Sequence, residues 1–545
     1  MNNKLILNKM KSINKYILFG ALGFTAVACN DLDTEPMGST ITSDQKGDVI
    51  KRDPEMISAS TNAIPTMFKQ FGNTLGTSAH LDFGYPGVML GLDSRTSDMV
   101  SDVLGYNWFS EQVEYSDNTT TARMTRMIWG TMYNQIFACN EVIGNVDMES
   151  SDPEVMYFAA QALGFRANAY FVLAQLYQHT YVGHQSDPCV PIITDQNKDE
   201  VSINGAPRAS VEEVYTLIRS DIDKSIELLE SANRIAYTTR SDKAFLSAAS
   251  AHGLRARINL VQQRWSEAYE DAAFAIQKGR MTPYSIAEVS VPSFWNGADH
   301  SWLWGVMIDE SDRVVTTGIC NWPSMACSFS SNGYVAVGAW RKGSKALYES
   351  ITSSDVRKGW WLDESGASPN LSAAQQAYLD ESIQPPATPE YVNVKFDIYN
   401  GNFSRPVCAN DIPLMRVEEM YLIAAEALGM NGDVAGGAQL LRQFVSTYRD
   451  PNYEFTTGSA QDLQDEVWRQ RRIELWGEGI AYYDIMRLNK GIDRRGAGFQ
   501  PSYVYNIPAG DNILLYQIPQ TEVEGNKALG ANNPSATRPT PVADR

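Results

Sequence analysis

The sequence has 545 residues, of which 43% are hydrophobic and 20% are charged, a composition typical of an ordinary globular protein. Its length allows a large core and two or three domains. The formal net charge of −19 argues against a nucleic-acid partner, because phosphate binding needs a cationic surface. No internal apolar run approaches the roughly 20 residues that a membrane-spanning helix needs.

Residues 1–28 have the pattern of a secretory signal peptide, with lysines first, then an apolar run, then small residues before Cys29. The alanines just before Cys29 resemble a bacterial lipobox. We therefore expect Cys29 to carry acyl chains that hold the protein to a membrane. The alternative is ordinary cleavage that leaves a plain exported cysteine. The choice between Met1 and Met10 as the start of translation stays open. Acidic residues just after Cys29 resemble the export tag of cell-surface lipoproteins.

The other five cysteines are Cys139, Cys189, Cys320, Cys327 and Cys408. Their odd number and the lack of a C-x-x-C pair argue against a disulfide framework, and no zinc site is readable. Cys139 lies in an apolar helical run, which predicts a small buried side chain. Whether Cys320 pairs with Cys327 stays open.

A polar tether is expected at residues 30–55, followed by a helix at 57–71. Residues 80–121 mix glycine, proline, aspartate and aromatic residues without a sustained period. This pattern predicts long loops, and long ordered loops are usually functional. We expect Tyr106 and Trp108 to project from them.

Strong helical periods are present at residues 124–146 and 159–178. Ser210 and Glu213 have the spacing of a capping box, which predicts the start of another helix. Segments 243–262 and 265–277 are two helical patterns joined by a short turn, with alanines and a glycine where the helices would cross. That arrangement is typical of a tetratricopeptide-like unit.

A second helical region spans residues 411–490. Its first half predicts a helical hairpin that begins near Leu414 and is interrupted by Asn-Gly-Asp. In the next helix, Arg471, Glu474 and Glu478 fall on one face and would form a ladder of ion pairs. We interpret these charges as groups that lock helices together and not as an acid–base pair.

Between these regions, residues 283–410 lose the helical period and contain seven of the twelve tryptophans. The alternation around Trp302 and Trp304 predicts a strand with one ring buried, and residues 391–399 predict a second strand. Three aromatic residues of this region, Trp322, Tyr334 and Trp340, lie among turn residues, where a large ring is less easily buried.

Flat aromatic rings suit sugars, because a pyranose ring has apolar faces that stack on them and polar edges that bond to amide, carboxylate and arginine groups. For each ring the alternative is packing beneath a loop. The five aromatic residues that we select as candidate ligand-binding residues are Tyr106, Trp108, Trp322, Tyr334 and Trp340.

Several motifs together resemble the SusD/RagB family of outer-membrane nutrient-binding lipoproteins. They are Trp129-x-x-x-Tyr133, Arg166-Ala167, Arg416-x-x-Glu419-x-x-Leu422-x-x-Ala425-Glu426-Ala427, Arg471-Arg472-x-Glu474-Leu475-x-x-Glu478-Gly479, Asp484, Arg487 and a closing segment at 506–534. Gln470 is a departure, because the family usually places glutamate there. The resemblance spans nearly all of the mature chain.

The resemblance implies a mainly α-helical protein with one SusD-like unit at residues 29–545. Tetratricopeptide-like helix pairs would form a scaffold at about 56–282 and 411–490, and irregular ligand-binding segments would lie at about 80–120 and 283–410. It also implies an outer-membrane lipoprotein that captures an oligosaccharide and delivers it to a partner TonB-dependent (SusC-like) transporter.

Two other functions compete with oligosaccharide capture. RagB-like members imply peptide capture, and abundant acidic residues allow a glycosidase that uses two carboxylates. However, the sequence has no nucleophile elbow, P-loop or H-E-x-x-H motif, so we expect no catalytic residues, no cofactor and no metal site readable from sequence. The identity of the ligand and calcium binding in the irregular region stay open.

Overall fold

The computed structural model describes residues 54–103, 105–403 and 406–545. The predicted signal peptide, the Cys29 lipidation site and nearly all of the tether lie outside the described residues. Residues 53–545 cluster into one compact unit. Within the described part of the chain, no helix is both long enough and apolar enough to cross a membrane.

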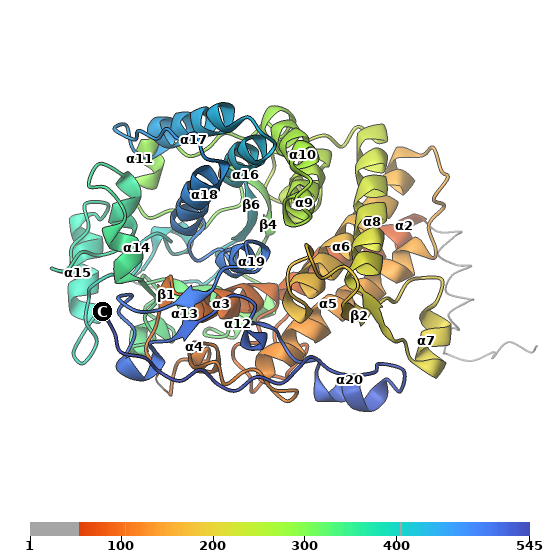
Figure 1. Cartoon of the computed structure of the whole chain (residues 1–545), viewed down its shortest axis with the longest axis horizontal. Helices are drawn as coiled ribbons and strands as arrows, with labels where there is room; N and C mark the ends of the chain where they lie inside the picture. The colour runs from red at the N-terminus through yellow and green to blue at the C-terminus, as the bar shows by residue number, and fades with distance from the viewer. Residues whose placement is uncertain (1–53, 104, 404–405) are drawn as a thin grey trace, which may run out of the picture. The chain divides into compact units, whose positions relative to one another are not determined.

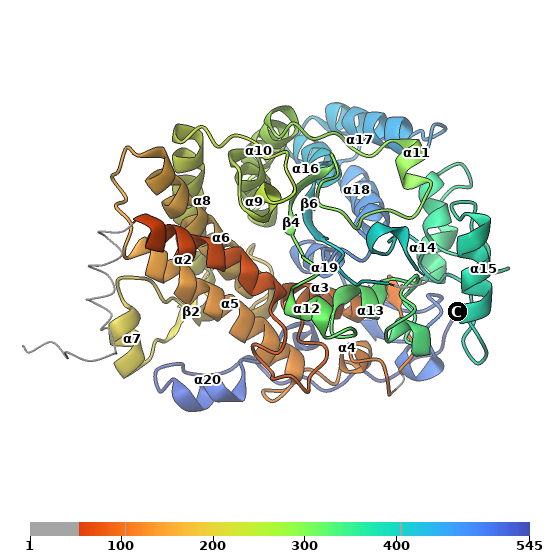
Figure 2. The same ribbon diagram turned by 180° about the vertical axis from the view of Figure 1, so that it is seen from behind.

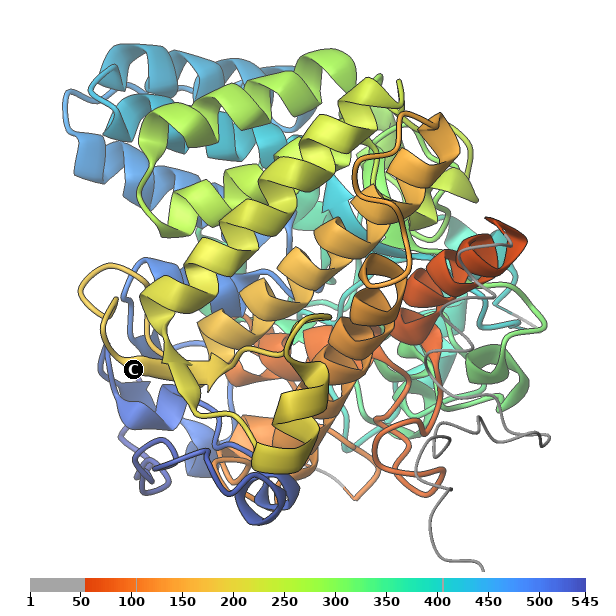
Figure 3. The same ribbon diagram turned by 90° about the vertical axis from the view of Figure 1, so that its right-hand side faces the viewer.

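Long helices from the first half of the chain pack side by side (Figure 1). They are α2 (Pro54–Thr66), α5 (Arg123–Ile143), α6 (Pro153–Tyr177) and α8 (Val211–Ser231). Figure 3 shows these red, orange and yellow helices running in similar directions. From Phe158 to Tyr177 every residue of α6 is buried, because α5 covers one side of it and α8 another. The predicted capping box of Ser210 and Glu213 is present at the start of α8.

The remaining helix pairs come from two distant parts of the sequence. They are α9 (Ala248–Val261) with α10 (Trp265–Lys278), and α16 (Val417–Met430) with α17 (Val434–Tyr448) and α18 (Ala460–Glu474). Small residues permit close approach between the helices. A side chain on Gly437 of α17 would come within 2.5 Å of the Ala425 carbonyl oxygen on α16. The prediction of a mainly α-helical fold built on helix pairs is confirmed.

The strands of the described residues form two-stranded antiparallel sheets. The pairs are β4 (Trp302–Val306) with β6 (Ile412–Arg416), β1 (Met99–Val100) with β5 (Lys342–Gly343), β2 (Pro188–Pro191) with β3 (Arg208–Ser210), and β7 (Ile492–Asp493) with β8 (Asn506–Ile507). The β4–β6 ribbon is drawn between α9 on one side and α18 on the other (Figure 2), and it contacts α9 and α16.

Three predictions about extended segments were wrong. Both tryptophan rings of β4 are buried and not one, because the Trp304 ring packs on Phe165 and the Trp302 Nε1 donates a hydrogen bond to Tyr284. Leu414 lies in β6, so the helical hairpin begins later than the apolar period suggests. The segment 391–399 makes isolated bridges to three different partners and no continuous strand.

The segment 80–121 is less irregular than its composition predicts. It contains α3 (Tyr85–Arg95), whose eleven residues are all buried, and the short helix α4 (Ser110–Glu114). Gly84 precedes α3 with φ at +83°, and a side chain there would strike the Phe68 carbonyl oxygen. Pro86 is tolerated because it stands at the start of the helix, where its missing N–H breaks no bond.

Short helices make up much of the irregular region at 283–410. They are α11 (Ile286–Val289), α12 (Arg313–Thr316), α13 (Trp322–Ala326), α14 (Lys345–Glu349) and α15 (Ala373–Ser382). Outside it, α7 (Lys198–Asn204) lies between β2 and β3 in the chain, and α19 (Ala481–Arg487) and α20 (Gln520–Gly525) lie near the C-terminus. The cysteines of the described residues are all free and buried, so Cys320 and Cys327 do not pair. Cys139 is buried on α5, as predicted.

Candidate functional site

The five predicted ring positions fall into two groups. Tyr106 is 59% exposed, and Trp108 and Tyr334 are half-buried. Trp322 and Trp340 are each only 3% exposed, so the expectation that their rings resist burial among turn residues was wrong. Trp322 opens α13, and its ring packs edge-on against Phe396 at a centroid distance of 4.7 Å. These two residues belong to the core beneath the loops.

Trp108 and Tyr334 come together with His80 in one aromatic cluster. The His80 ring stacks on the Trp108 indole at a centroid distance of 4.9 Å, and the Tyr334 ring meets the indole edge-on at 6.3 Å. A hydrogen bond joins His80 Nδ1 and the Tyr334 hydroxyl. Sequence reasoning missed His80, because its partner Tyr334 is 254 residues away. We call His80, Trp108 and Tyr334 the aromatic platform.

The platform also presents polar groups. Burial raises the pKa of the Tyr334 hydroxyl, although a hydrogen bond from Trp108 opposes that rise, so the phenol stays protonated at neutral pH. The Arg123 guanidinium lies 5.4 Å from the Trp108 ring centroid and is held by Glu111, with Nη2 and Oε1 2.7 Å apart. Aromatic surface and hydrogen-bonding groups therefore occur side by side, as a sugar site needs.

A buried arginine fastens the loop that carries Trp108. Arg341 Nη2 donates to Asn107 Oδ1 over 3.0 Å, and Arg341 Nε donates to the Met325 carbonyl oxygen over 3.1 Å. Burial lowers the pKa of Arg341 to about 9. The Asn107 side chain also donates to the Asp102 carbonyl oxygen over 2.8 Å. These hydrogen bonds fix Asn107, the residue directly before Trp108.

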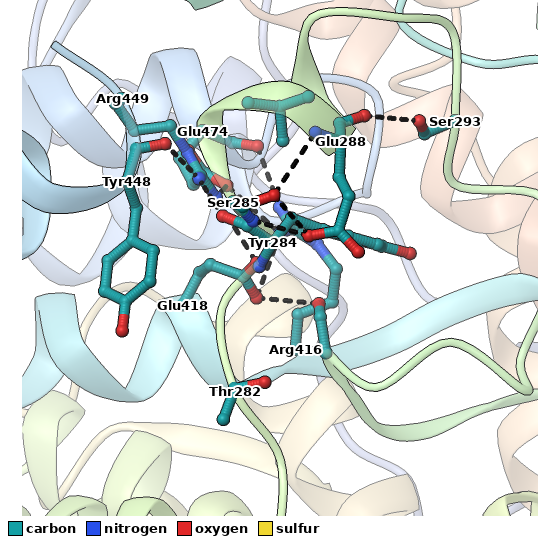
Figure 4. Close-up of polar contacts among 12 residues, drawn as sticks. Thr282, Tyr284, Ser285, Glu288, Ser293, Arg416, Glu418, Tyr448, Arg449 and Glu474 are labelled. Carbon is teal, nitrogen blue, oxygen red and sulfur yellow. Dashed lines mark hydrogen bonds and ion pairs between the residues drawn. The ribbon is translucent and has the colours of Figure 1, made fainter.

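The conspicuous charges of the C-terminal helices form a network between elements, and the predicted ladder along one helix was wrong. Glu474 bonds to Arg449 at 2.7 Å and to Arg416 at 3.0 Å (Figure 4). Glu478 lies beyond the end of α18 and bonds to Lys395 at 2.6 Å. Arg471 pairs with neither glutamate, because its Nε bonds to Asp484 at 2.7 Å.

The network is structural. Glu474 is fully buried, and burial alone would raise its pKa, but Arg449, Arg416 and Arg357 outweigh this and hold the pKa well below its usual range. Gln470 takes a role that a glutamate could fill, since its Oε1 accepts a hydrogen bond of 2.6 Å from Arg357. The interpretation that these charges lock elements together is confirmed.

The described residues contain no group of three or more histidine, cysteine, aspartate or glutamate side chains arranged to hold a metal ion. The platform itself offers stacking by its rings and hydrogen bonding by His80 and Tyr334.

Two family models match the chain in sequence. One, described as starch-binding associating with outer membrane, covers residues 77–258, and the SusD family model covers residues 359–535. The chain belongs to the SusD/RagB family. His80 and Trp108 lie within the segment matched by the first SusD/RagB model, and Tyr334 lies between the two matched segments. The ion-pair network of Glu474 lies mainly within the second matched segment.

Similar proteins agree with this assignment. A SusD-like protein, P38, from Formosa agariphila is 23% identical over 419 residues, which is 70% of this chain and 76% of that protein. A SusD-like carbohydrate binding protein from Bacteroides vulgatus has a TM-score of 0.70 at 21% identity, covering 87% of this chain and 97% of its own. The surface glycan-binding protein A from Bacteroides thetaiotaomicron, solved with laminarihexaose, has a TM-score of 0.63 at 17% identity, covering 88% and 99%. The structural likeness shows a SusD fold.

Proposed function

We propose that this SusD/RagB protein captures oligosaccharides on the cell surface and passes them to a TonB-dependent transporter, without chemical conversion. The observation that carries the proposal is the aromatic platform, where Trp108 and Tyr334 meet from segments more than 200 residues apart. A preassembled aromatic surface lowers the entropic cost of binding, because its side chains are already ordered.

Capture without chemistry is supported by how the carboxylates are used. Glu474 and Glu478 are buried in bonds to arginines and Lys395, so neither is available as an acid or base. Near the platform, Glu111 is paired with Arg123. A glycosidase needs two carboxylates that face each other across the bound sugar, and the platform residues supply rings, a hydroxyl and an imidazole instead.

Membrane anchoring and delivery rest on other observations. Cys29 follows a signal-peptide pattern, and the family model that matches residues 77–258 is described as associating with the outer membrane. Acylation of Cys29 with more than one chain would supply a stable membrane anchor. Mass spectrometry of the mature N-terminus tests the anchor, and co-purification of a large outer-membrane barrel with the native protein tests the partner.

Binding itself is tested by calorimetry on the purified protein with laminarihexaose, maltohexaose and a mixed hexapeptide, each also assayed for product release. Retention of an oligosaccharide without release of reducing ends supports the proposal. Steady release of reducing ends would establish an enzyme, and binding of the peptide alone would establish RagB-like peptide capture.

A further inference from the structure

A second pair of aromatic rings lines a pocket at the end of the β4–β6 ribbon. Trp295 and Tyr399 are both half-buried, and their rings meet edge-to-face with centroids 5.5 Å apart and planes at 83°. The pocket has a volume of about 340 Å³. Its other lining residues are Arg240, Asn296, Ile308, Asp309, Glu310, Asn400 and Asp411. It shares no residue with the aromatic platform.

Two consecutive residues hold the rings in position. Asn410 is fully buried, and its Oδ1 accepts a hydrogen bond of 2.9 Å from the Tyr399 backbone N–H. The next residue, Asp411, donates its backbone N–H to the Trp295 carbonyl oxygen over 3.0 Å. Because both residues directly precede β6, the strand itself fixes the spacing of the two rings.

The floor of the pocket is equally ordered. The Asp411 carboxylate is 3% exposed and accepts two hydrogen bonds of 2.7 Å from Arg240, one of 2.8 Å from the Gly297 N–H and one of 2.7 Å from the Ile308 N–H. Arg240 also donates to Asp309 over 3.0 Å. A floor whose groups satisfy one another needs no ligand to hold its shape.

The rim, in contrast, offers groups to a ligand. Burial and the nearby Glu310 carboxylate raise the pKa of the Tyr399 hydroxyl, and Glu310 is exposed, so its carboxylate can accept from a ligand hydroxyl. Asn296 Oδ1 accepts a hydrogen bond from the Ala298 N–H, and the side-chain amide N–H groups of Asn296 can donate to a ligand. Rings at right angles with amides and a carboxylate at their edges match the face and edge of a sugar ring.

We propose that this pocket, lined by Trp295 and Tyr399, is a second binding site that takes a neutral sugar residue. It adds to the proposed capture at the platform a separate point of attachment, which increases the avidity for any glycan long enough to engage both. A salt bridge links the neighbourhoods of the two sites: Lys69, eleven positions before His80 of the platform, bonds at 2.6 Å to Asp312, which closely follows the pocket's Asp309 and Glu310 in sequence.

The charges favour a neutral ligand over an anionic or cationic one. The three carboxylates at the pocket, of Asp309, Glu310 and Asp411, face one guanidinium within it, so an acidic sugar would meet like charge. Asp309 and Asp411 are already paired with Arg240, so these two carboxylates gain little from a cationic ligand. The hydroxyl groups of a neutral sugar meet no like charge and need no unpaired counter-charge.

The test compares Trp295→Ala with a matched control, Trp265→Ala, which truncates another half-buried tryptophan at the start of α10. Both are made in the wild-type chain and in Trp108→Ala, and calorimetry measures binding of laminarihexaose, maltohexaose, trigalacturonate and trilysine. Thermal melts check folding, and Tyr399→Ala replaces Trp295→Ala if the latter unfolds.

In the Trp108→Ala background, we expect Trp295→Ala to weaken residual binding of a neutral oligosaccharide by about tenfold and Trp265→Ala to leave it unchanged. Equal binding by the Trp295→Ala and Trp265→Ala variants in both backgrounds overturns the second site and leaves the proposed function standing. Binding of trilysine or trigalacturonate that depends on Trp295 overturns the neutral-sugar assignment. A wild-type chain that binds neither neutral hexasaccharide overturns this site and the proposed function together.

Discussion

Arg341 and Asn107 are joined by a hydrogen bond of 3.0 Å from Nη2 to Oδ1, so a fully buried guanidinium holds the residue directly before Trp108. Arg341 forms no salt bridge with any described residue. Its guanidinium donates hydrogen bonds to two oxygen atoms, Asn107 Oδ1 and the Met325 carbonyl oxygen. The position of the loop that carries Trp108 therefore depends on a side chain 234 residues later in the sequence.

Replacing Arg341 by methionine should test this anchor. The change removes both hydrogen bonds while keeping an apolar stem, and we expect a loss of about 2–3 kcal/mol in the free energy of unfolding. Hydrogen–deuterium exchange should rise at residues 105–109 more than in α6. Equal exchange at residues 105–109 in both proteins would show that Arg341 does not hold the loop.

Trp108→Ala should weaken oligosaccharide binding by about tenfold, because it removes the central ring of the platform. His80 and Tyr334 would lose their shared partner without exposing the core. Calorimetry with the hexasaccharide that binds best measures the effect, and Phe137→Ala on α5, a 46% exposed ring, is the control. Unchanged affinity in the Trp108 variant would remove the platform from the binding site.

Trp322→Ala should lower the free energy of unfolding without removing a ligand contact. Its ring is buried against Phe396, so truncation leaves a cavity and costs about 3–5 kcal/mol. Tyr106→Ala, at a ring that is 59% exposed, should stay within about 0.5 kcal/mol of wild type. Urea denaturation of the two variants gives the comparison, and similar midpoints would contradict the burial of Trp322.

Glu474→Gln should destabilise the fold by about 3–5 kcal/mol, because it leaves Arg416 and Arg449 buried without their shared counter-charge. The exposed pair of Lys224 and Glu227 provides the control, and Glu227→Gln should cost less than about 1 kcal/mol. Denaturation midpoints measure both. If the two substitutions cost the same, the buried network contributes no more than a surface pair.

Stability should fall steeply in acid. The folded-state pKa of Glu474 lies well below its usual value of 4.5, so the folded protein binds fewer protons than the unfolded chain. That stabilisation is complete above pH 4.5 and is lost as the pH falls from there towards the folded-state pKa. At Asp93 the effect of burial prevails and raises the pKa to about 8.

The contributions of Glu474 and Asp93 to the dependence of stability on pH can be measured separately. Asp93 favours folding while it is protonated. This contribution is complete below the ordinary pKa of 3.8 and is lost as the pH rises from there to 8. Asp93→Asn mimics the protonated form, so we expect it to flatten the decline in stability between pH 3.8 and 8 and to leave the loss of stability below pH 3.8 unchanged. Melting temperatures measured from acid to mildly alkaline pH check both expectations, and a flat acid limb in the wild type would contradict the account of Glu474.

The long helices were predictable because their signals are local. The capping box of Ser210 and Glu213 lies within four residues, and apolar residues recur along one face of α8. Helix α3 was missed because Gly84 and Pro86, which usually break structure, here shape its start. The partners of Glu474 could not be read from its neighbours, since Arg416 lies 58 residues away.

The candidate site was predictable only in part, for the same reason. Aromatic residues in loops mark a region, but which rings reach the surface depends on what covers them. Trp322 is covered by Phe396, which lies 74 positions later, and Trp108 remains half-exposed beside His80. No spacing rule links these residues, because each contact is made by chain segments that approach only in the folded protein.

Contacts between the two ends of the described chain have a consequence for synthesis. Asp98 accepts a hydrogen bond of 2.8 Å from Arg472, 374 residues later, and Arg494 donates one of 2.6 Å to the carbonyl oxygen of Val113. A nascent chain that still lacks its last hundred residues cannot close around these groups. Maturation therefore finishes only after translation is nearly complete, a timing that suits a polypeptide expected to leave the cytoplasm before it folds.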